Sequence, residues 1–134
     1  MGPVVVDASV VRAFRDADDA HHRAVDRVLT NARNQGARLV LPASAFAESL
    51  VPPLVAGISA ERATDALTRV FTVEPLTSDI ALAAARLRAT TKLRLPDALV
   101  VATGISIDAD QVLTCDKGWR GSDGRVRIVG GTRT

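Results

Sequence analysis

The sequence predicts an α/β protein: a three-layer α/β/α sandwich around a central parallel sheet of about five strands. Short apolar runs alternate along the chain with longer segments of helical periodicity. Because right-handed crossover helices return the chain to the same edge of a sheet, this alternation favours parallel strands covered on both faces. The length of 134 residues fits one domain, residues 1–134, and no repeat or linker divides it.

Five short runs predict the strands. The first, PVVV, is β-branched and ends at the first acidic residue, Asp7. The fourth, QVLTC, likewise leads directly into Asp116. The strands are expected at residues 3–6, 38–42, 71–75, 111–115 and 125–129.

Helical segments separate these strands. The first helix is expected to have Ser9 as its N-cap, and the second to stop near Gly36. Pro52 and Pro53 are expected to kink or end the third helix, whereas Pro96 opens the last one, where proline is favoured. The helices are expected at residues 9–14, 20–34, from 43 onward, 59–70, 78–91 and 96–105.

Cysteine usage and the first residues bear on the compartment. Cys115 is the only cysteine, which excludes an internal disulfide and a four-cysteine zinc site and suits a reducing cytosol. The start MGPVVVDASV has no basic region and too short an apolar run for a signal peptide or a membrane span. We therefore expect a cytoplasmic protein with no membrane partner.

The net charge is +2, and Lys92 and Lys117 are the only lysines among 17 basic residues. Arginine suits phosphate recognition, and basic residues gather in residues 86–94 and 117–134. These runs are either solvated faces or a surface for a polyanion. Because aromatic residues are scarce, contact with phosphates is expected rather than base stacking. The expected phosphate contacts are Arg12, Arg88, Lys92, Arg94, Lys117 and Arg120.

Four acidic residues are expected at the carboxyl edge of the sheet. Asp7 and Asp116 follow strands, and Glu48 lies about one turn into the helix after the second strand. Asp97 lies in the first turn of the last helix, which the extended segment 90–95 can carry back to this edge. The acids would meet where the strand order reverses, if the first strand lies beside the fourth.

Two hydroxyl residues accompany the acids. Ser9 lies two residues after Asp7, and Thr114 lies two residues before Asp116, so each is expected to face the same side as its acid and to support the site.

Clustered carboxylates repel one another unless a cation neutralises them. Because all the predicted ligands are oxygen atoms, the ion expected is Mg²⁺, with Mn²⁺ as a substitute, rather than zinc. Taken singly, Asp97 could only stabilise a helix N-terminus, and Asp7 and Asp116 could only begin loops. Glu48 is harder to explain that way, because its flanking sequence SAFAESLV is apolar.

The segments VVVDASV, FAESL, RLPDALVVATG and VLTCDKGW resemble the acidic motifs of PIN-domain nucleases, in particular the VapC toxins of toxin-antitoxin modules. The resemblance spans residues 4–119. It implies a Mg²⁺-dependent endoribonuclease in which Asp7, Glu48, Asp97 and Asp116 are the catalytic metal-site carboxylates. It also implies a homodimer and a VapB-type antitoxin whose tail covers the site. The Pro52–Pro53 pair departs from the family pattern along the third helix, where a dimer contact could form.

Two other functions compete with this hypothesis. A metal-free ribonuclease would use His21 or His22 and would release cyclic phosphates. A non-catalytic module, either a degenerate PIN domain or a receiver-like domain, would bind Mg²⁺ or a partner helix. The receiver pattern is disfavoured, because no acid pair precedes Asp7 and RIVGG contains no lysine. Trp119 is expected to pack against the last strand or to lie over a base near the acidic site.

Overall fold

The computed structural model describes residues 1–130, which form a parallel five-stranded sheet in the order β3-β2-β1-β4-β5. The strands are β1 (Val4–Val6), β2 (Leu39–Pro42), β3 (Thr72–Glu74), β4 (Gln111–Thr114) and β5 (Val126–Ile128). The helices are α1 (Ala8–Arg15), α2 (His22–Asn34), α3 (Ala43–Val55), α4 (Ala60–Thr68), α5 (Ser78–Thr90) and α6 (Leu95–Ser106), with a 3₁₀ turn η1 (Lys117–Trp119).

The first strand occupies the centre of the sheet. Val5 pairs with Val40 of β2 on one side and with Val112 of β4 on the other. All three residues of β1 are fully buried, as a strand covered on both faces requires. The strand order reverses between β1 and β4, so the predicted placement of the first strand beside the fourth is confirmed.

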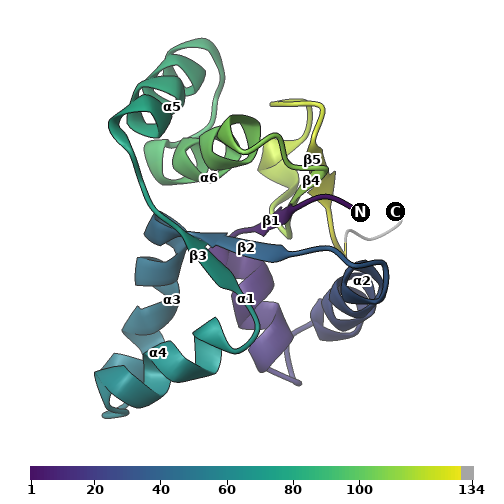
Figure 1. Ribbon diagram of the computed structural model, residues 1–134, viewed down its shortest axis with the longest axis vertical. Helices are drawn as coiled ribbons and strands as arrows, with labels where there is room; N and C mark the ends of the chain where they lie inside the picture. Colours follow the sequence, from purple (N-terminus) through teal and green to yellow (C-terminus); the bar gives the residue numbers. More distant parts are fainter. Residues whose placement is uncertain (131–134) are drawn as a thin grey trace.

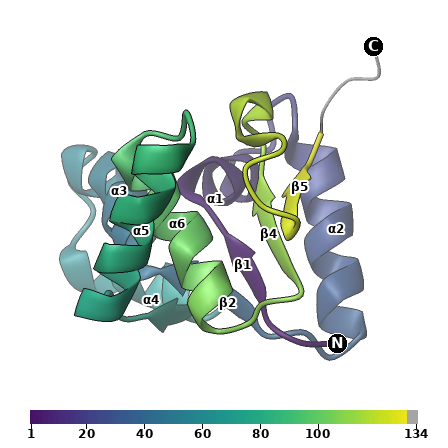
Figure 2. The ribbon, with the colours of Figure 1, turned by 90° about the horizontal axis from the view of Figure 1, so that it is seen from above.

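Helices cover both faces of the sheet, which confirms the predicted three-layer α/β/α architecture. Figure 1 shows α5 and α6 on one side of the strands and α1 and α2 on the other. In Figure 2, α3 and α4 lie at the opposite side of the molecule from α2. Gly104 lets α6 approach the sheet closely, because a Cβ atom there would collide with the Val112 side chain of β4.

The first helix corrects one prediction. Its N-cap is Asp7 rather than Ser9, since the Asp7 carboxylate accepts a hydrogen bond from the Val10 amide and the helix begins at Ala8. The last residue before the helix is thus an acid held at the edge of the sheet. Ser9 lies inside the first turn, where its hydroxyl is free to bond elsewhere.

The third helix corrects another. It continues through Pro52 and Pro53 to Val55, so of the two expected outcomes, a kink or an end, the end is wrong. Proline lacks an amide N–H, which leaves the carbonyl four residues earlier without its helical partner. The guanidinium of Arg15 on α1 takes that role for Pro53, because its Nη2 donates to the Ser49 carbonyl at 2.6 Å.

Smaller differences occur at other ends. The second helix begins at His22 instead of residue 20, and α5 is capped by the Thr77 side chain. The predicted loop after β4 contains η1, whose N-cap is Asp116. Within residues 1–130, no helix has both the length and the apolar character needed to cross a membrane.

Candidate functional site

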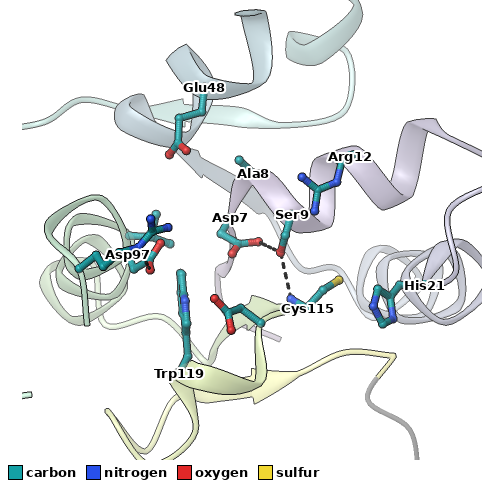
Figure 3. Close-up of a pocket in the computed structure, with 12 residues that line it drawn as sticks. Asp7, Ala8, Ser9, Arg12, His21, Glu48, Asp97, Cys115 and Trp119 are labelled. Atoms are coloured by element: carbon teal, nitrogen blue, oxygen red, sulfur yellow. Dashed lines mark hydrogen bonds and ion pairs between the residues drawn. The ribbon is translucent and has the colours of Figure 1, made fainter. Parts of the chain in front are cut away.

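A cavity of about 380 Å³ opens at the carboxyl edge of the sheet, next to the ends of β1 and β4. The four predicted acids all line it, although they come from four separate parts of the chain. In Figure 3 the side chains of Glu48, Asp7 and Asp97 point into the same space. The lining residues are Asp7, Ala8, Ser9, Arg12, His21, Glu48, Arg94, Asp97, Val100, Cys115, Asp116 and Trp119.

Asp7 is the most deeply placed of these acids, at 7% exposure. Its Oδ1 accepts hydrogen bonds from Ser9 Oγ at 2.6 Å and from the Val10 amide at 3.0 Å. Its Oδ2 accepts one from Thr114 Oγ1 at 2.7 Å. Both predicted supporting hydroxyls therefore contact Asp7 directly.

The direction of these hydroxyl bonds is determined by the backbone. Ser9 Oγ accepts from the Cys115 amide at 3.0 Å (Figure 3). Thr114 Oγ1 accepts from the Asp116 amide at 3.0 Å. Since each hydroxyl oxygen already receives an amide proton, each directs its own proton to the Asp7 carboxylate. The network connects the start of α1 to the end of β4 and holds Asp7 in one orientation.

Burial governs the charge state of Asp7. Desolvation raises the pKa of its carboxyl, and the hydrogen bonds from Ser9 and Thr114 oppose that rise. The negative charge of Asp97 adds a smaller upward contribution to the pKa. A cation in the cavity would relieve both unfavourable effects.

Asp97 enters from the first turn of α6, where Pro96 occupies one of the first helical positions. Burial raises the pKa of its carboxyl, and Arg94, whose Nε lies 3.6 Å from Asp97 Oδ2, partly offsets this. The Trp119 indole N–H is buried and has no hydrogen-bond partner within the described residues. It nevertheless lies close enough to the Asp97 carboxyl to lower its pKa slightly.

Glu48 and Asp116 complete the acidic rim. Glu48 lies on α3 and is exposed as a whole residue. The pKa of its carboxyl is raised first by partial burial and then by the negative charges of Asp97 and Asp7. Asp116 is also exposed, and its Oδ1 accepts from the Gly118 amide at 2.8 Å, which closes the turn after β4. These two acids can therefore move more freely than Asp7.

The donor set fits a hard divalent ion in chemistry, because it consists of carboxylate oxygens. Among residues 1–130, no three His, Cys, Asp or Glu side chains already lie at metal-binding spacing. Asp7 and Asp116 accept hydrogen bonds from neighbouring groups, and Asp97 pairs with Arg94. Mg²⁺ keeps several of its waters and is commonly bound through one or two carboxylates, so the cavity can accommodate it without an all-protein cage.

The predicted phosphate contacts divide into groups. Arg12 and Arg94 line the acidic cavity, whereas Lys92 and Arg120 line a second cavity beside it. Arg88, on α5, lines neither, and Lys117 belongs to η1. Arg133, in the basic run 117–134, lies outside the described residues.

The two histidines differ in their relation to the cavity. His21 lines it, and its Nδ1 lies 2.9 Å from the Gly130 carbonyl. His22 does not line it, and its Nδ1 lies 2.7 Å from the Ala13 carbonyl. Of the two imidazoles, only that of His21 lies at the cavity, so a metal-free reaction there would have to use His21 without His22.

Sequence reasoning placed Trp119 at the cavity only as one of two alternatives, and it did not place Cys115 there. Trp119 was expected to pack against the last strand or lie over a base, and it is buried at 2% exposure while also forming a wall of the cavity. Cys115 half-faces the cavity, and burial raises the pKa of its thiol to about 11, so it stays protonated at neutral pH. The only sequence signal for their position was the alternation of side chains between the two faces along β4 and into the turn after it.

The parallel sheet with acids around a cavity at its carboxyl edge defines a class of α/β proteins, and comparison with known proteins identifies the family. The family model for the PIN domain matches residues 4–123. The chain therefore belongs to the PIN domain family. No curated protein matches the chain significantly.

Solved structures share this fold at low sequence identity. A toxin-antitoxin complex from Klebsiella pneumoniae is 20% identical, with a TM-score of 0.75 over 93% of this chain and 96% of that one. Mycobacterium tuberculosis VapC20, described as a sarcin-ricin loop cleaving toxin, is 19% identical, with a TM-score of 0.73 over 94% and 98%. FitAcB from Neisseria gonorrhoeae is 18% identical, with a TM-score of 0.68 over 92% and 95%.

Proposed function

We propose that this protein is a Mg²⁺-dependent endoribonuclease that acts as the toxin of a toxin-antitoxin pair. The observation that carries the proposal is the convergence of four carboxylates, from residues 7 to 116, on one cavity bordered by arginines. Membership of the PIN domain family supports it. So does the similarity of the fold to a toxin described as cleaving the sarcin-ricin loop.

Asp7, Asp97 and Asp116 would hold the ion, with Mn²⁺ as a possible substitute. The chemistry that bound Mg²⁺ supplies is polarisation of a phosphate and acidification of a water molecule. Asp7 suits the central position because Ser9 and Thr114 fix its orientation. Arg94 lies beside Asp97 and is positioned to attract the phosphate that the acids would repel.

Glu48 would orient the attacking water or help to hold a second ion. Its pKa is raised by burial and by the neighbouring acids, which makes its carboxylate a better proton acceptor than an ordinary surface glutamate. In-line attack on the phosphorus would leave a 5′-phosphate on one product and a 3′-hydroxyl on the other. A metal-free mechanism would instead give cyclic phosphates.

Cleavage of total RNA by the purified chain, with Mg²⁺ and with EDTA, tests the proposal. Asp97→Asn should lower the rate by at least about 100-fold, because it removes a carboxylate from the ion site. Asp26→Asn, on the exposed face of α2, is the matched control and should keep full activity. Full activity of Asp97→Asn, or cleavage that persists in EDTA, would refute the proposal.

The proposed partners are an antitoxin of the VapB type and a second copy of this chain. The relatives described as toxin-antitoxin complexes support the first. Exposed apolar side chains near the end of α3, namely Val51, Leu54, Val55 and Ile58, offer a surface for protein contact. Copurification with the product of the adjacent gene and the measured mass in solution test both proposals.

A further inference from the structure

A second cavity, of about 280 Å³, lies beside the acidic one and differs from it in charge. Its lining contains two cations, Lys92 and Arg120, and no carboxylate. We call it the basic pocket. Its lining residues are Thr90, Thr91, Lys92, Leu93, Gly118, Arg120, Gly121 and Ser122.

The basic pocket and the acidic cavity are built from the same two segments. In the segment before α6, Lys92 lines the basic pocket and Arg94 lines the acidic cavity. In the turn after β4, Gly118 and Arg120 line the basic pocket, while Trp119 between them lines the acidic cavity. The two sites are therefore neighbours along both segments.

The two cations of the basic pocket have no acidic partners. Neither Lys92 nor Arg120 forms an ion pair with any residue of 1–130, whereas Arg94 pairs with Asp97 and Arg125 pairs with Asp108. Both side chains are exposed, so their charges face solvent at the pocket. An anion bound between them would meet no carboxylate lining the pocket.

The hydroxyl groups of the basic pocket do not have free protons to donate to a bound anion. Thr90 donates to the Arg86 carbonyl, Thr91 donates to the Leu87 carbonyl, and Ser122 donates to the Trp119 carbonyl. With these protons committed, the free side-chain donors are those of Lys92 and Arg120. Gly121, at a φ of 80°, adds backbone without a side chain, which leaves the pocket open.

We propose that the basic pocket binds a backbone phosphate of the RNA strand that flanks the scissile phosphate held at the acidic cavity. This inference rests on the proposed function and adds a subsite to it. A strand needs such a contact, because the four acids repel the phosphates that lie away from the ion. Arg120 and Lys92 would thus fix the path of the strand past Trp119.

The salt dependence of RNA binding tests this subsite. The probe is a short labelled single-stranded RNA, bound to the full chain in EDTA, with its length verified afterwards. The variant is Lys92→Gln with Arg120→Gln. The control is Arg33→Gln with Arg38→Gln, which removes the same charge at the opposite edge of the sheet, where α2 ends and β2 begins.

Loss of one phosphate contact on a single strand should make the plot of log K against log salt concentration shallower by about 0.7. We expect this change for the Lys92 and Arg120 variant, and an unchanged slope for the control. Equal slopes for wild type and the Lys92 and Arg120 variant would overturn the subsite. Equal changes in the two double variants would overturn it too, because they would reflect net charge alone.

Inorganic phosphate is the second probe, because a free anion would use the same donors. At matched ionic strength, phosphate should weaken RNA binding by wild type more than RNA binding by the Lys92 and Arg120 variant. An equal effect of phosphate on wild type and on the Lys92 and Arg120 variant would overturn the proposal, because it would show that RNA and phosphate do not compete for these two side chains. Cleavage of RNA by wild type with Mg²⁺ is measured separately. If wild type cleaves RNA but the variant has the same salt dependence of binding as wild type, only the subsite is contradicted and the proposed function stands.

Discussion

Thr114 shows how one hydroxyl can serve two partners at the site. It donates to Asp7 Oδ2 and accepts from the Asp116 amide, so Thr114→Val leaves both groups without that bond. We expect a loss of about 1 to 3 kcal/mol in the free energy of unfolding, measured by urea denaturation. Thr114→Ser keeps the hydroxyl and should lose only about 0.8 kcal/mol for the missing methyl.

The same pair of variants should differ in the pH profile of RNA cleavage. A hydrogen bond from Thr114 lowers the pKa of Asp7, so its removal should raise that pKa and move the acidic limb of the profile to higher pH. Thr114→Ser should keep the wild-type limb. Identical profiles for the valine and serine variants would mean that the hydroxyl does not act through Asp7.

Asp7 should also make stability depend on pH. Burial raises its pKa above 3.8, so between that value and the raised one the folded state binds more protons than the unfolded state. The free energy of unfolding contributed by Asp7 therefore falls as pH rises through this window. Asp7→Asn removes the titration, so in EDTA its stability relative to wild type should increase as the pH rises from 3.8 through the raised pKa of Asp7. A difference that stays constant with pH would contradict this assignment.

Sequence reasoning at the residue scale succeeded for residues whose position follows from chain direction. Asp7 and Asp116 line the cavity because parallel strands all end at one edge of the sheet. Asp97 lines it because the extended segment before α6 returns the chain to that edge, where α6 begins. Their role as ion ligands stays a prediction. The N-cap was misassigned, because serine and aspartate have similar capping preference and only the start of α1 distinguishes them.

At the scale of elements, α3 depends on a contact from another helix. Arg15 donates to the Ser49 carbonyl that Pro53 leaves without a partner, so Arg15→Met should cost about 1.5 kcal/mol in the free energy of unfolding. In the background Pro53→Ala the residue 53 amide can take the carbonyl, and the cost should largely disappear. Urea denaturation of the four proteins measures this coupling.

The neighbouring proline provides the control for this cycle. Pro52→Ala restores an amide that faces the Glu48 carbonyl instead, so the cost of Arg15→Met should persist in that background. If both proline replacements abolished the cost, the contribution of Arg15 would be packing of its side chain rather than the hydrogen bond.

Element boundaries limited the sequence prediction in two places. Proline chemistry alone predicts a kink or an end at Pro52 and Pro53. The tertiary donor Arg15 is 34 residues away from its acceptor, so it leaves no local signal that the helix continues. The 3₁₀ turn at residues 117–119 is too short for a periodic pattern, although it brings Trp119 to the cavity. Longer segments such as α5 and α6 were predicted because their type does not depend on one contact.

At the scale of the whole molecule, the fold gathers charges that oppose its own stability. The raised pKa values of Asp7, Glu48 and Asp97, each caused first by burial, indicate that these acids are held where their ionised forms are unfavourable. Each acid comes from a different element, and β1 and β4 meet at the point of strand reversal between them. An ion bound there would connect α1, α3, α6 and the end of β4.

Mg²⁺ should therefore stabilise the entire fold rather than one loop. An ion that binds only the folded state contributes about 2.7 kcal/mol when its concentration is about 100 times Kd, which raises Tm measurably. We expect Mg²⁺ and Mn²⁺ to raise the Tm of the EDTA-treated protein, and Asp97→Asn to lose most of that rise. Asp26→Asn should retain it, since this residue is on α2 and does not line the cavity. An equal rise in Asp97→Asn and wild type would locate the ion elsewhere, and no rise in wild type would mean that the acids do not bind it.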